Sequence, residues 1–158
     1  MIVDQGELRL ATEADAETLL SLINRAFDVE RFFIDADRLR LDEVYERLGS
    51  GCFLMLEQDG AAVTCVYLEQ RGERAYLGLL SVDPKRQGQG LGARMMAAAE
   101  EHCRRQGCRH LDLRVVNLRE ELPPFYRKFG YVEIGTSPFP PEEPVKMACH
   151  FIEMSKEL

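Results

Sequence analysis

The chain has 158 residues, 46% hydrophobic and 30% charged, with a formal net charge of −7; this length predicts a single domain, residues 1–158, with a core large enough to be stable without disulfides. The acidic balance argues against a nucleic-acid partner, and the lack of any apolar run of about 18 residues argues against a membrane partner. The five cysteines form no C-x-x-C pair, which argues against a disulfide framework and a metal site and favours a cytoplasmic protein with reduced thiols.

Residue patterns in the first half of the chain predict a strand, two helices and three consecutive strands. Thr12 is the expected N-cap of the first helix, since acidic residues and then apolar residues at helical spacing follow it. The dipeptide Asp59-Gly60 is typical of a tight hairpin turn between two of the strands. The predicted elements are a strand at 7–11, helices at 12–28 and 37–48, and strands at 52–57, 61–69 and 75–82.

The pattern changes after residue 82, where helices alternate with strands. Gly107 is the expected C-cap of a long helix, and Pro123-Pro124 begin a short one. The predicted elements are helices at 90–106 and 125–129 and strands at 109–116, 131–135 and 145–154, with a proline-rich loop at 137–144. We therefore expect an α/β (α+β mixed) fold, in which helices flank both faces of a central mixed, mostly antiparallel β-sheet of about seven strands.

The segment from Val82 to Gly92 is the most informative part of the sequence. Gly88, Gly90 and Gly92 alternate where a strand passes into a helix. Glycine allows close backbone approach and positive φ, and the unpaired N–H groups at a helix start favour an anion. Lys85-Arg86 adds positive charge at the same place. A pyrophosphate is therefore the ligand that this segment predicts.

Two other phosphate-binding patterns fit this segment less well. A nucleotide P-loop requires a lysine followed by serine or threonine, which the segment lacks. The dinucleotide fingerprint G-x-G-x-x-A is met by Gly88, Gly90 and Ala93, with Asp112 lying 19 residues beyond Ala93. That fingerprint places its glycines directly after the strand, whereas residues 83–87 intervene here. A nicotinamide-dependent oxidoreductase is thus a third-ranked alternative.

Two motifs together resemble the GNAT superfamily of N-acetyltransferases. Residues 87–92, Gln-Gly-Gln-Gly-Leu-Gly, resemble its Q/R-x-x-G-x-G/A motif and follow the expected Val-x-Pro at 82–84. Residues 125–131, FYRKFGY, resemble its F-Y-x-K-x-G-F block. The order of the predicted elements agrees with the superfamily over nearly the whole chain. The resemblance implies a GNAT-like acyl-CoA N-acyltransferase fold and an enzyme that uses acetyl-CoA as co-substrate and no metal.

The resemblance also implies which residues bind the coenzyme. Coenzyme A is expected where strands 75–82 and 109–116 separate, with a backbone N–H near Leu80 polarising the thioester carbonyl. Asn117 matches an asparagine of relatives, although it lies further before Tyr126 than it does in them. The implied coenzyme-binding residues are Leu80, Ser81, Val82, Gln87, Gly88, Gln89, Gly90, Leu91, Gly92 and Asn117.

Tyr126 matches the general-acid tyrosine of the superfamily, and the resemblance implies that it protonates the thiolate of coenzyme A. The general base is left open. The glutamate that many relatives carry aligns with Gly78, which has no side chain to act, so Glu73, His150 and a bound water are the candidates. In relatives, the region between the first two helices lines the acceptor pocket. The candidate acceptor-binding residues are Phe27, Phe32, Phe33 and His150.

The sequence therefore predicts an N-acetyltransferase that moves the acetyl group of acetyl-CoA to a primary amine by direct attack in a ternary complex. The acceptor is either a small-molecule amine or a peptide amine, and the protein is a monomer or a homodimer. The alternative is a non-catalytic acyl-CoA-binding regulatory module of the same fold. The missing glutamate at Gly78 favours that alternative, and the retained Tyr126 opposes it.

Overall fold

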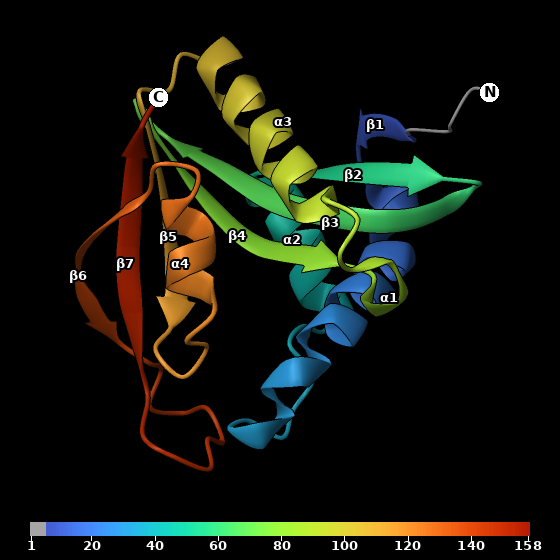
Figure 1. Ribbon diagram of the computed structural model, residues 1–158. Coiled ribbons are helices and arrows are strands. Elements are labelled where there is room, and N and C mark those ends of the chain that lie inside the picture. Colours follow the sequence, from blue (N-terminus) through green and yellow to red (C-terminus); the bar gives the residue numbers. More distant parts are fainter. Residues whose placement is uncertain (1–5) are drawn as a thin grey trace.

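The computed structural model describes residues 6–158, which form one seven-stranded β-sheet with helices packed on it (Figure 1). The strand order is β1-β2-β3-β4-β5-β7-β6. The strands are β1 (Glu7–Leu10), β2 (Cys52–Gln58), β3 (Ala61–Arg71), β4 (Arg74–Val82), β5 (His110–Val116), β6 (Val132–Pro138) and β7 (His150–Glu157). The α-helices are α1 (Ala16–Phe27), α2 (Leu41–Ser50), α3 (Leu91–Arg105) and α4 (Leu122–Arg127), and the 3₁₀ turns are η1 (Glu13–Asp15), η2 (Asp28–Phe32) and η3 (Pro84–Arg86).

Five of the six strand pairs are antiparallel, and β4 with β5 forms the parallel pair. Parallel neighbours need a crossover connection, which α3 supplies. The β4–β5 pairing is confined to residues 74–76 against residues 110–112. Beyond these residues β4 turns away while β5 continues alongside β7 (Figure 1). The predicted fold class is confirmed, and the divergence leaves a V-shaped opening between the two halves of the sheet.

Helices cover both faces of the sheet because each carries an apolar stripe that must be buried. α3 and α4 lie on the face turned toward the viewer in Figure 1, and α1 and α2 lie behind the sheet. Two hydrophobic cores result, one between the sheet and α3 and one between the sheet and α1 with α2. Met96 and Leu22, one from each core, have no exposed surface. Within residues 6–158, every helix is too short or too polar to cross a membrane.

A β-bulge interrupts β4 close to the opening. The pairing register with β3 shifts so that Val66 lies opposite both Leu79 and Leu80. Leu79 adopts a left-handed φ of 56°, a conformation that costs a non-glycine residue about 1–2 kcal/mol. The bulge reverses the side-chain alternation, since Leu77 and Leu80 both pack toward α3 while Leu79 packs toward α1 and α2. It therefore re-aims the peptide groups of β4 next to the opening.

Two helical segments begin three or more residues away from the predicted start. The second helix begins at Leu41 rather than at residue 37, because the Arg40 N–H donates to Glu43 Oε1 at 3.0 Å and caps the helix there. The last helix begins at Leu122 rather than at residue 125, because Pro123-Pro124 occupy its first turn. Proline is tolerated there, since the N–H groups of a first turn have no intrahelical acceptor.

The last strand is the largest correction to the predicted elements. The sequence predicts that it begins at Val145, and the structure places it at His150–Glu157. The residues before it pair elsewhere: Val145 forms an isolated β-bridge with Ile34, and the Lys146 N–H donates to the Phe33 carbonyl at 2.7 Å. The loop between β6 and β7 therefore contacts the segment after α1, at the bottom of Figure 1.

Candidate active site

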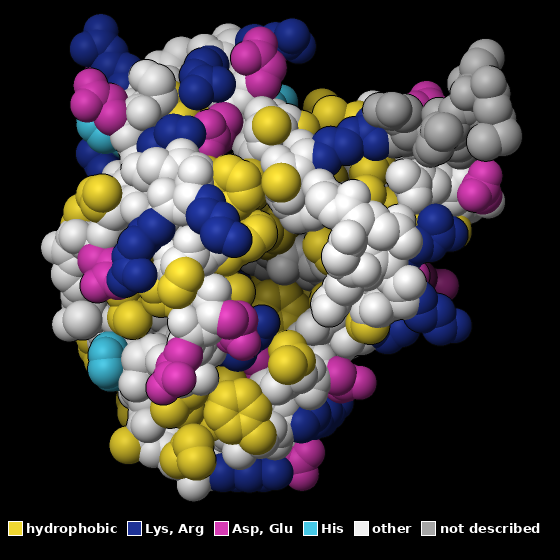
Figure 2. Space-filling view, viewed as in Figure 1, with side chains coloured by type: hydrophobic (Ala, Val, Ile, Leu, Met, Phe, Trp, Pro, Cys, Tyr) yellow, Lys and Arg dark blue, Asp and Glu magenta, His cyan; other side chains and the backbone are white. Residues whose placement is uncertain are grey.

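A cavity of about 830 Å³ opens where β4 and β5 diverge. Its walls come from these two strands, from the start of α3, from α4, and from the segments that follow α1 and β6. Figure 2 shows a hollow near the middle of this face, with hydrophobic side chains in its walls and charged side chains at its rim. A concave site of this size and mixed character is suited to a cofactor or a small substrate.

The start of α3 forms an anion cradle at one end of the cavity. Gly88 and Gly90 have φ angles of 82° and 76°, which residues with side chains rarely adopt. The first helical hydrogen bond runs from the Arg94 N–H to the Gly90 carbonyl at 3.0 Å. The N–H groups of residues 91–93 therefore point out of the helix start without an intrahelical acceptor. These donors, together with the helix dipole, favour a negatively charged group such as a pyrophosphate.

Basic side chains and a close helix contact surround the anion cradle. Arg86 and Lys128 line the cavity, and Arg86 Nη1 donates to Gln58 Oε1 at 3.1 Å. Gly92 packs against α4, because a Cβ placed on it would lie 3.3 Å from the Phe125 ring. The small residue at position 92 thus lets α3 and α4 approach, while the two cations add positive charge to the cradle.

Peptide groups of β4 face the opening between β4 and β5. The Asp83 N–H donates to the Val63 carbonyl at 2.8 Å, so the alternate residue Ser81 also directs its peptide groups toward β3. The peptide groups of Leu80 and Val82 point away from β3, toward the space that β5 leaves by diverging from β4. An extended ligand arm can therefore bond to these groups as an added strand does.

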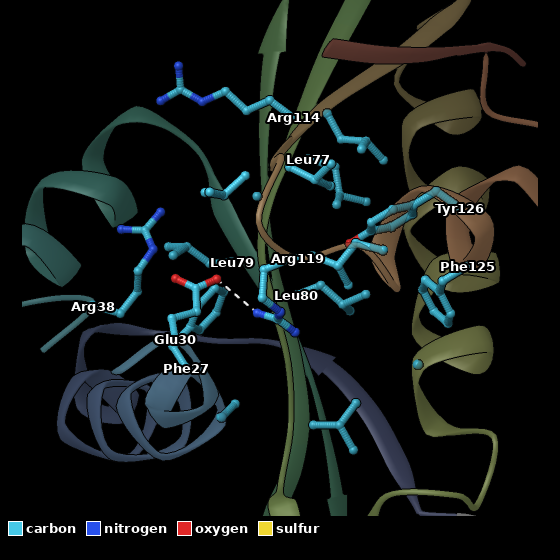
Figure 3. A pocket seen from close by; sticks show the side chains of 18 of the residues that line it. Phe27, Glu30, Arg38, Leu77, Leu79, Leu80, Arg114, Arg119, Phe125 and Tyr126 are labelled. Atoms are coloured by element: carbon cyan, nitrogen blue, oxygen red, sulfur yellow. Dashed lines mark hydrogen bonds and ion pairs between the residues drawn. The ribbon is translucent and has the colours of Figure 1, made fainter. Parts of the chain in front are cut away.

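Tyr126 lies on α4 with its hydroxyl directed into the cavity (Figure 3). The residue is 6% exposed, and its ring packs edge-on against Phe125 with 5.0 Å between the centroids. Its hydroxyl forms no hydrogen bond with any residue from 6 to 158. Burial raises the pKa of Tyr126 well above its ordinary value, and the nearby charge of Arg119 opposes this shift. The hydroxyl therefore stays protonated at neutral pH and is free to donate to a ligand.

A buried ion pair lies in the cavity wall, on the other side of β4 from Phe125 (Figure 3). Arg119 Nη1 donates to Glu30 Oε2 at 2.8 Å, and neither side chain is more than 14% exposed. Burial raises the pKa of Glu30 above its ordinary value, and the charges of Arg119 and Arg38 oppose the shift. Glu30 Oε1 accepts no hydrogen bond from residues 6–158. That oxygen is therefore available to a ligand in the cavity.

Tyr76 fills the space beside Gly78. Both residues line the cavity, and a Cβ placed on Gly78 would lie 3.0 Å from the Tyr76 ring. Arg71 also contacts this ring, with its Cζ 4.9 Å from the ring centroid. In this rotamer, the Tyr76 ring therefore occupies the space that a glutamate side chain at position 78, which the sequence resemblance leads one to expect, would need.

The cavity brings together most of the predicted coenzyme-binding residues but few of the predicted acceptor-binding residues. The predicted site residues that line it are Phe27, Leu80, Val82, Gln87, Gly88, Gly90, Leu91, Gly92 and Tyr126. The predicted site residues outside its wall are Phe32, Phe33, Ser81, Gln89, Asn117 and His150.

Several of the residues outside the cavity wall have a structural reason to be there. Ser81 is 1% exposed, and its Oγ donates to a backbone carbonyl of its own strand. Asn117 Oδ1 accepts from the His150 N–H at 2.8 Å, which ties the loop after β5 to the start of β7. Phe33 is fully buried in a small core cluster, whereas Phe32 is half exposed on the surface. The positions of Phe32, Phe33 and His150 give no support to their predicted contact with an acceptor.

Asp112, the acidic residue of the dinucleotide alternative, is already engaged. It accepts two hydrogen bonds from Arg74, at 2.8 and 2.7 Å, and one from Ser155 Oγ at 2.6 Å. It also lies where β4 and β5 are still paired, outside the cavity wall. Asp112 therefore does not offer a ribose hydroxyl the acidic partner that a dinucleotide site supplies.

Sequence reasoning missed Glu30, Arg119 and Tyr76 as residues of this cavity. Glu30 and Arg119 are 89 positions apart along the chain, so no local motif joins them. The alternation of strand 75–82 places Tyr76 and Gly78 on one face, which was a usable signal, but the covering of Gly78 by the ring depends on the rotamer of Tyr76. These three residues become recognisable only once the fold has closed the cavity.

The chain matches the model of the acetyltransferase (GNAT) family over residues 16–131. It is 29% identical over 124 residues to glucosamine 6-phosphate N-acetyltransferase 1 of Oryza sativa subsp. japonica, with 72% of this chain and 73% of that relative covered. Its fold is similar to that of the ribosomal-protein-S18-alanine N-acetyltransferase of Escherichia coli, with a TM-score of 0.81, 17% identity, and 97% and 94% of the two chains covered. The ribosomal-protein-alanine N-acetyltransferase of Brucella melitensis shares the fold as well, with a TM-score of 0.78, 20% identity, and 96% and 99% of the chains covered.

Proposed function

The chain belongs to the acetyltransferase (GNAT) family and is an acyl-CoA-dependent N-acetyltransferase; from this premise we propose that it transfers the acetyl group of acetyl-CoA to a primary amine by direct attack in a ternary complex. One observation carries this proposal. The cavity at the β4–β5 divergence joins an anion cradle, outward-facing strand peptides and a buried tyrosine hydroxyl. These three features suit, in turn, the pyrophosphate, the pantetheine arm and the thioester of acetyl-CoA.

Three parts of the cavity wall suit three parts of acetyl-CoA. The N–H groups of residues 87–92, with the charges of Arg86 and Lys128, suit the pyrophosphate. The peptide groups of Leu80 and Val82 suit the amide-bearing pantetheine arm. The thioester then lies near Tyr126, where acyl transfer takes place.

Glu30 is the proposed base for the acceptor amine. Its free Oε1 faces the cavity, and its raised pKa favours taking up a proton. The carboxylate first attracts the ammonium form of the acceptor and then removes one proton, directly or through a water. The earlier candidates are less well placed, because Glu73 and His150 are both exposed and outside the cavity wall.

The remaining steps use Leu80 and Tyr126. The neutral amine forms a bond to the carbonyl carbon of the thioester, and the Leu80 N–H donates to the oxygen that becomes negative. The C–S bond then breaks as the carbonyl re-forms, and the nitrogen, which is positively charged after the attack, gives its second proton to water. Tyr126 gives its proton to the departing thiolate and recovers one from water afterwards. The raised pKa of Tyr126 keeps this donor loaded between turnovers.

Thiol release tests the proposal directly. The purified protein is titrated calorimetrically with coenzyme A, and free thiol is then followed after adding acetyl-CoA and a panel of amines. We expect coenzyme A to bind at one site and thiol to be released only when an amine is present. A protein with no affinity for coenzyme A contradicts the proposal. Binding without thiol release from any amine supports the non-catalytic module instead.

The acceptor is proposed to be a small molecule. The relative from rice acts, by its name, on glucosamine 6-phosphate, and the Escherichia coli protein on an alanine of a ribosomal protein. Here the loop between β6 and β7 contacts Ile34 and Phe33 beside the cavity, which narrows the room for a peptide and favours a small acceptor. We also place the activity in the cytoplasm, because all five cysteines are free thiols.

A further inference from the structure

Three arginines on different parts of the chain line the acceptor side of the cavity. Arg38 precedes α2, Arg47 lies on α2 and Arg114 lies on β5. Figure 3 shows Arg38 and Arg114 on one side of β4, with Tyr126 and Phe125 on the other. The start of α3 and α4, which suit the coenzyme, lie with Tyr126 and Phe125. The three arginines therefore face the space that is left for the acceptor.

Each of these arginines stacks on an aromatic ring. Stacking fixes the plane of a guanidinium by one face and leaves its N–H edge free for a planar or tetrahedral anion. The pairs are Arg38 over Phe27 at 5.4 Å, Arg47 over Tyr67 at 5.0 Å and Arg114 over Phe151 at 4.1 Å, measured from Cζ to the ring centroid. The three donors are thus held in place before any ligand arrives.

The guanidinium groups of the three arginines form no ion pair or hydrogen bond with another residue from 6 to 158. This is unexpected in a chain with a net charge of −7, where carboxylates outnumber cations. The acidic residues of the cavity wall are committed to other arginines, except for one on the loop before β7. Glu30 and Glu121 pair with Arg119, Asp37 pairs with Arg31, and Glu43 pairs with Arg40. Glu143, on the loop before β7, forms no ion pair.

The three charges also act on one another. Desolvation of the guanidinium lowers the pKa of Arg38, the charge of Glu30 opposes this shift, and the charges of Arg47 and Arg114 lower the pKa further. Like charges gathered without direct ion pairs destabilise the folded state. A structural role would be served better by an ion pair or by apolar side chains. The arrangement is explained if a ligand supplies the missing negative charge.

We propose that Arg38, Arg47 and Arg114 form an anion subsite of the acceptor pocket, and that the acceptor is a small primary amine that also carries a phosphate or a carboxylate. The inference rests on the proposed acetyltransferase function, because it places the amine at Glu30 and the anion at the three arginines. Glu30 and Arg38 are electrostatically coupled in the structure, so the two groups of the acceptor are close together.

Binding of simple anions tests the subsite without knowledge of the acceptor. The protein is first saturated with coenzyme A, which fills the anion cradle at α3, and is then titrated calorimetrically with inorganic phosphate or with acetate at low salt. We expect one site in the wild type, and Arg38→Gln or Arg114→Gln to weaken it about tenfold, the effect of losing one charge-assisted hydrogen bond. Arg105→Gln, which removes an exposed arginine far from the cavity, is the matched control and keeps wild-type binding.

Matched pairs of amines test the same subsite in turnover. O-phosphoethanolamine is compared with ethanolamine, and glycine with glycinamide, by thiol release from acetyl-CoA. We expect the anionic member of at least one pair to have the higher kcat/KM, and the pair that shows it identifies phosphate or carboxylate. Arg38→Gln and Arg114→Gln should lower the kcat/KM of the anionic member more than that of the neutral member and so remove the preference, whereas the control Arg105→Gln keeps it.

The outcomes separate this inference from the proposed function. A wild type that binds coenzyme A but neither phosphate nor acetate overturns the anion subsite and leaves the acetyltransferase proposal standing. Anion binding that survives both cavity variants overturns it equally, since the site then lies elsewhere. A protein that does not bind coenzyme A refutes the proposed function itself. The calorimetric result decides the inference even if no amine of the panel is a substrate.

Discussion

Tyr126 and Tyr131 are neighbouring aromatic residues with different surroundings. Their rings lie 6.0 Å apart in an edge-on contact, and both are buried. The Tyr131 hydroxyl donates to Glu100 Oε2 at 3.0 Å in the core, whereas the Tyr126 hydroxyl faces the cavity. The same phenol therefore stabilises the fold at one position and is available for chemistry at the other.

This contrast predicts opposite effects of one substitution at the two positions. Tyr126→Phe should lower kcat by about 10²–10⁴-fold, the usual contribution of a general acid. It should change the melting temperature little, because no hydrogen bond is lost. Tyr131→Phe should keep kcat but lower stability by about 1–3 kcal/mol, because Glu100 loses a buried donor. Steady-state kinetics and urea denaturation measure both. Equal kcat values for the wild type and Tyr126→Phe would exclude the acid role.

The raised pKa of Glu30 predicts that the reaction rate depends on pH. Its proposed role needs the carboxylate form, and burial raises the pKa of Glu30 above its ordinary value. The rate should therefore fall as pH decreases through that raised pKa. Glu30→Gln should lower kcat at neutral pH and remove this acid limb from the pH–rate profile. An acid limb that persists unchanged in Glu30→Gln assigns it to another group.

The same shift has a consequence for stability, and its sign follows from the proton balance. A carboxyl with a raised folded pKa binds its proton more tightly in the folded state. Its stabilising contribution is therefore present at low pH and is lost as pH rises through the raised pKa. The stability of Glu30→Gln relative to the wild type should increase between acid and neutral pH, measured by urea denaturation across that range.

At the scale of elements, α3 has a positive-φ glycine at each end. Gly90 precedes the helix with φ of 76°, and Gly107 follows it with φ of 84°. A Cβ on either glycine would meet no atom within 4 Å. The two positions therefore have the same backbone requirement and the same free space, and they differ only in which end of the helix they form.

Alanine at these two glycines separates backbone strain from ligand binding. Gly90→Ala and Gly107→Ala should each lower stability by about 1–2 kcal/mol, because alanine is strained at positive φ. Gly90→Ala alone should also weaken acetyl-CoA binding, since it displaces the N–H groups of the anion cradle. Calorimetry with acetyl-CoA and thermal denaturation give the two quantities. Equal loss of affinity in both variants would show that helix stability, and not the cradle, governs binding.

The β-bulge at Leu79 serves the same site from another element. It is a strained position in a strand, and strain of this kind is kept where the surrounding structure requires it. The bulge turns Leu79 toward α1 and α2 and leaves Leu80 next to the opening. The geometry of the proposed oxyanion donor thus depends on packing in both cores.

At the scale of the whole molecule, the sheet consists of two halves joined by a short parallel contact. β1 to β4 form one half and β5, β7 and β6 the other, and pairing between them is limited to residues 74–76 and 110–112. The cavity occupies the space between the halves. A ligand bound there contacts both halves and supplies hydrogen bonds that the sheet itself leaves unmade.

Amide hydrogen exchange should detect a ligand that contacts both halves of the sheet. Coenzyme A at 100 times its Kd stabilises the folded protein by about 2.7 kcal/mol. We expect the added protection to be largest for the amides of residues 80, 82 and 91–93, which face the cavity or form the cradle. The amides of β1 and β2 lie away from the cavity and should gain only the general stabilisation. A uniform gain along the whole chain would place the ligand elsewhere.

The sequence by itself determined the features that consecutive residues can encode. Gly88, Gly90 and Gly92 are readable as an anion cradle because they are neighbours on one loop. The Asp59-Gly60 turn was read correctly for the same reason, and both residues have positive φ. Alternating apolar residues predicted the strands, and the one helix between parallel strands predicted the sheet's mixed character. The general fold and the family follow from such local signals.

Only the tertiary structure decided the acceptor side of the site. The Glu30–Arg119 pair spans 89 positions, and the three unpaired arginines come from separate parts of the chain. The last strand was misplaced because Val145 satisfies its backbone by a bridge to Ile34 rather than in the sheet. The physical reason is the same in each case. Charge pairing, burial and backbone partners depend on distance in space, and residues far apart in sequence become neighbours only when the two cores have formed.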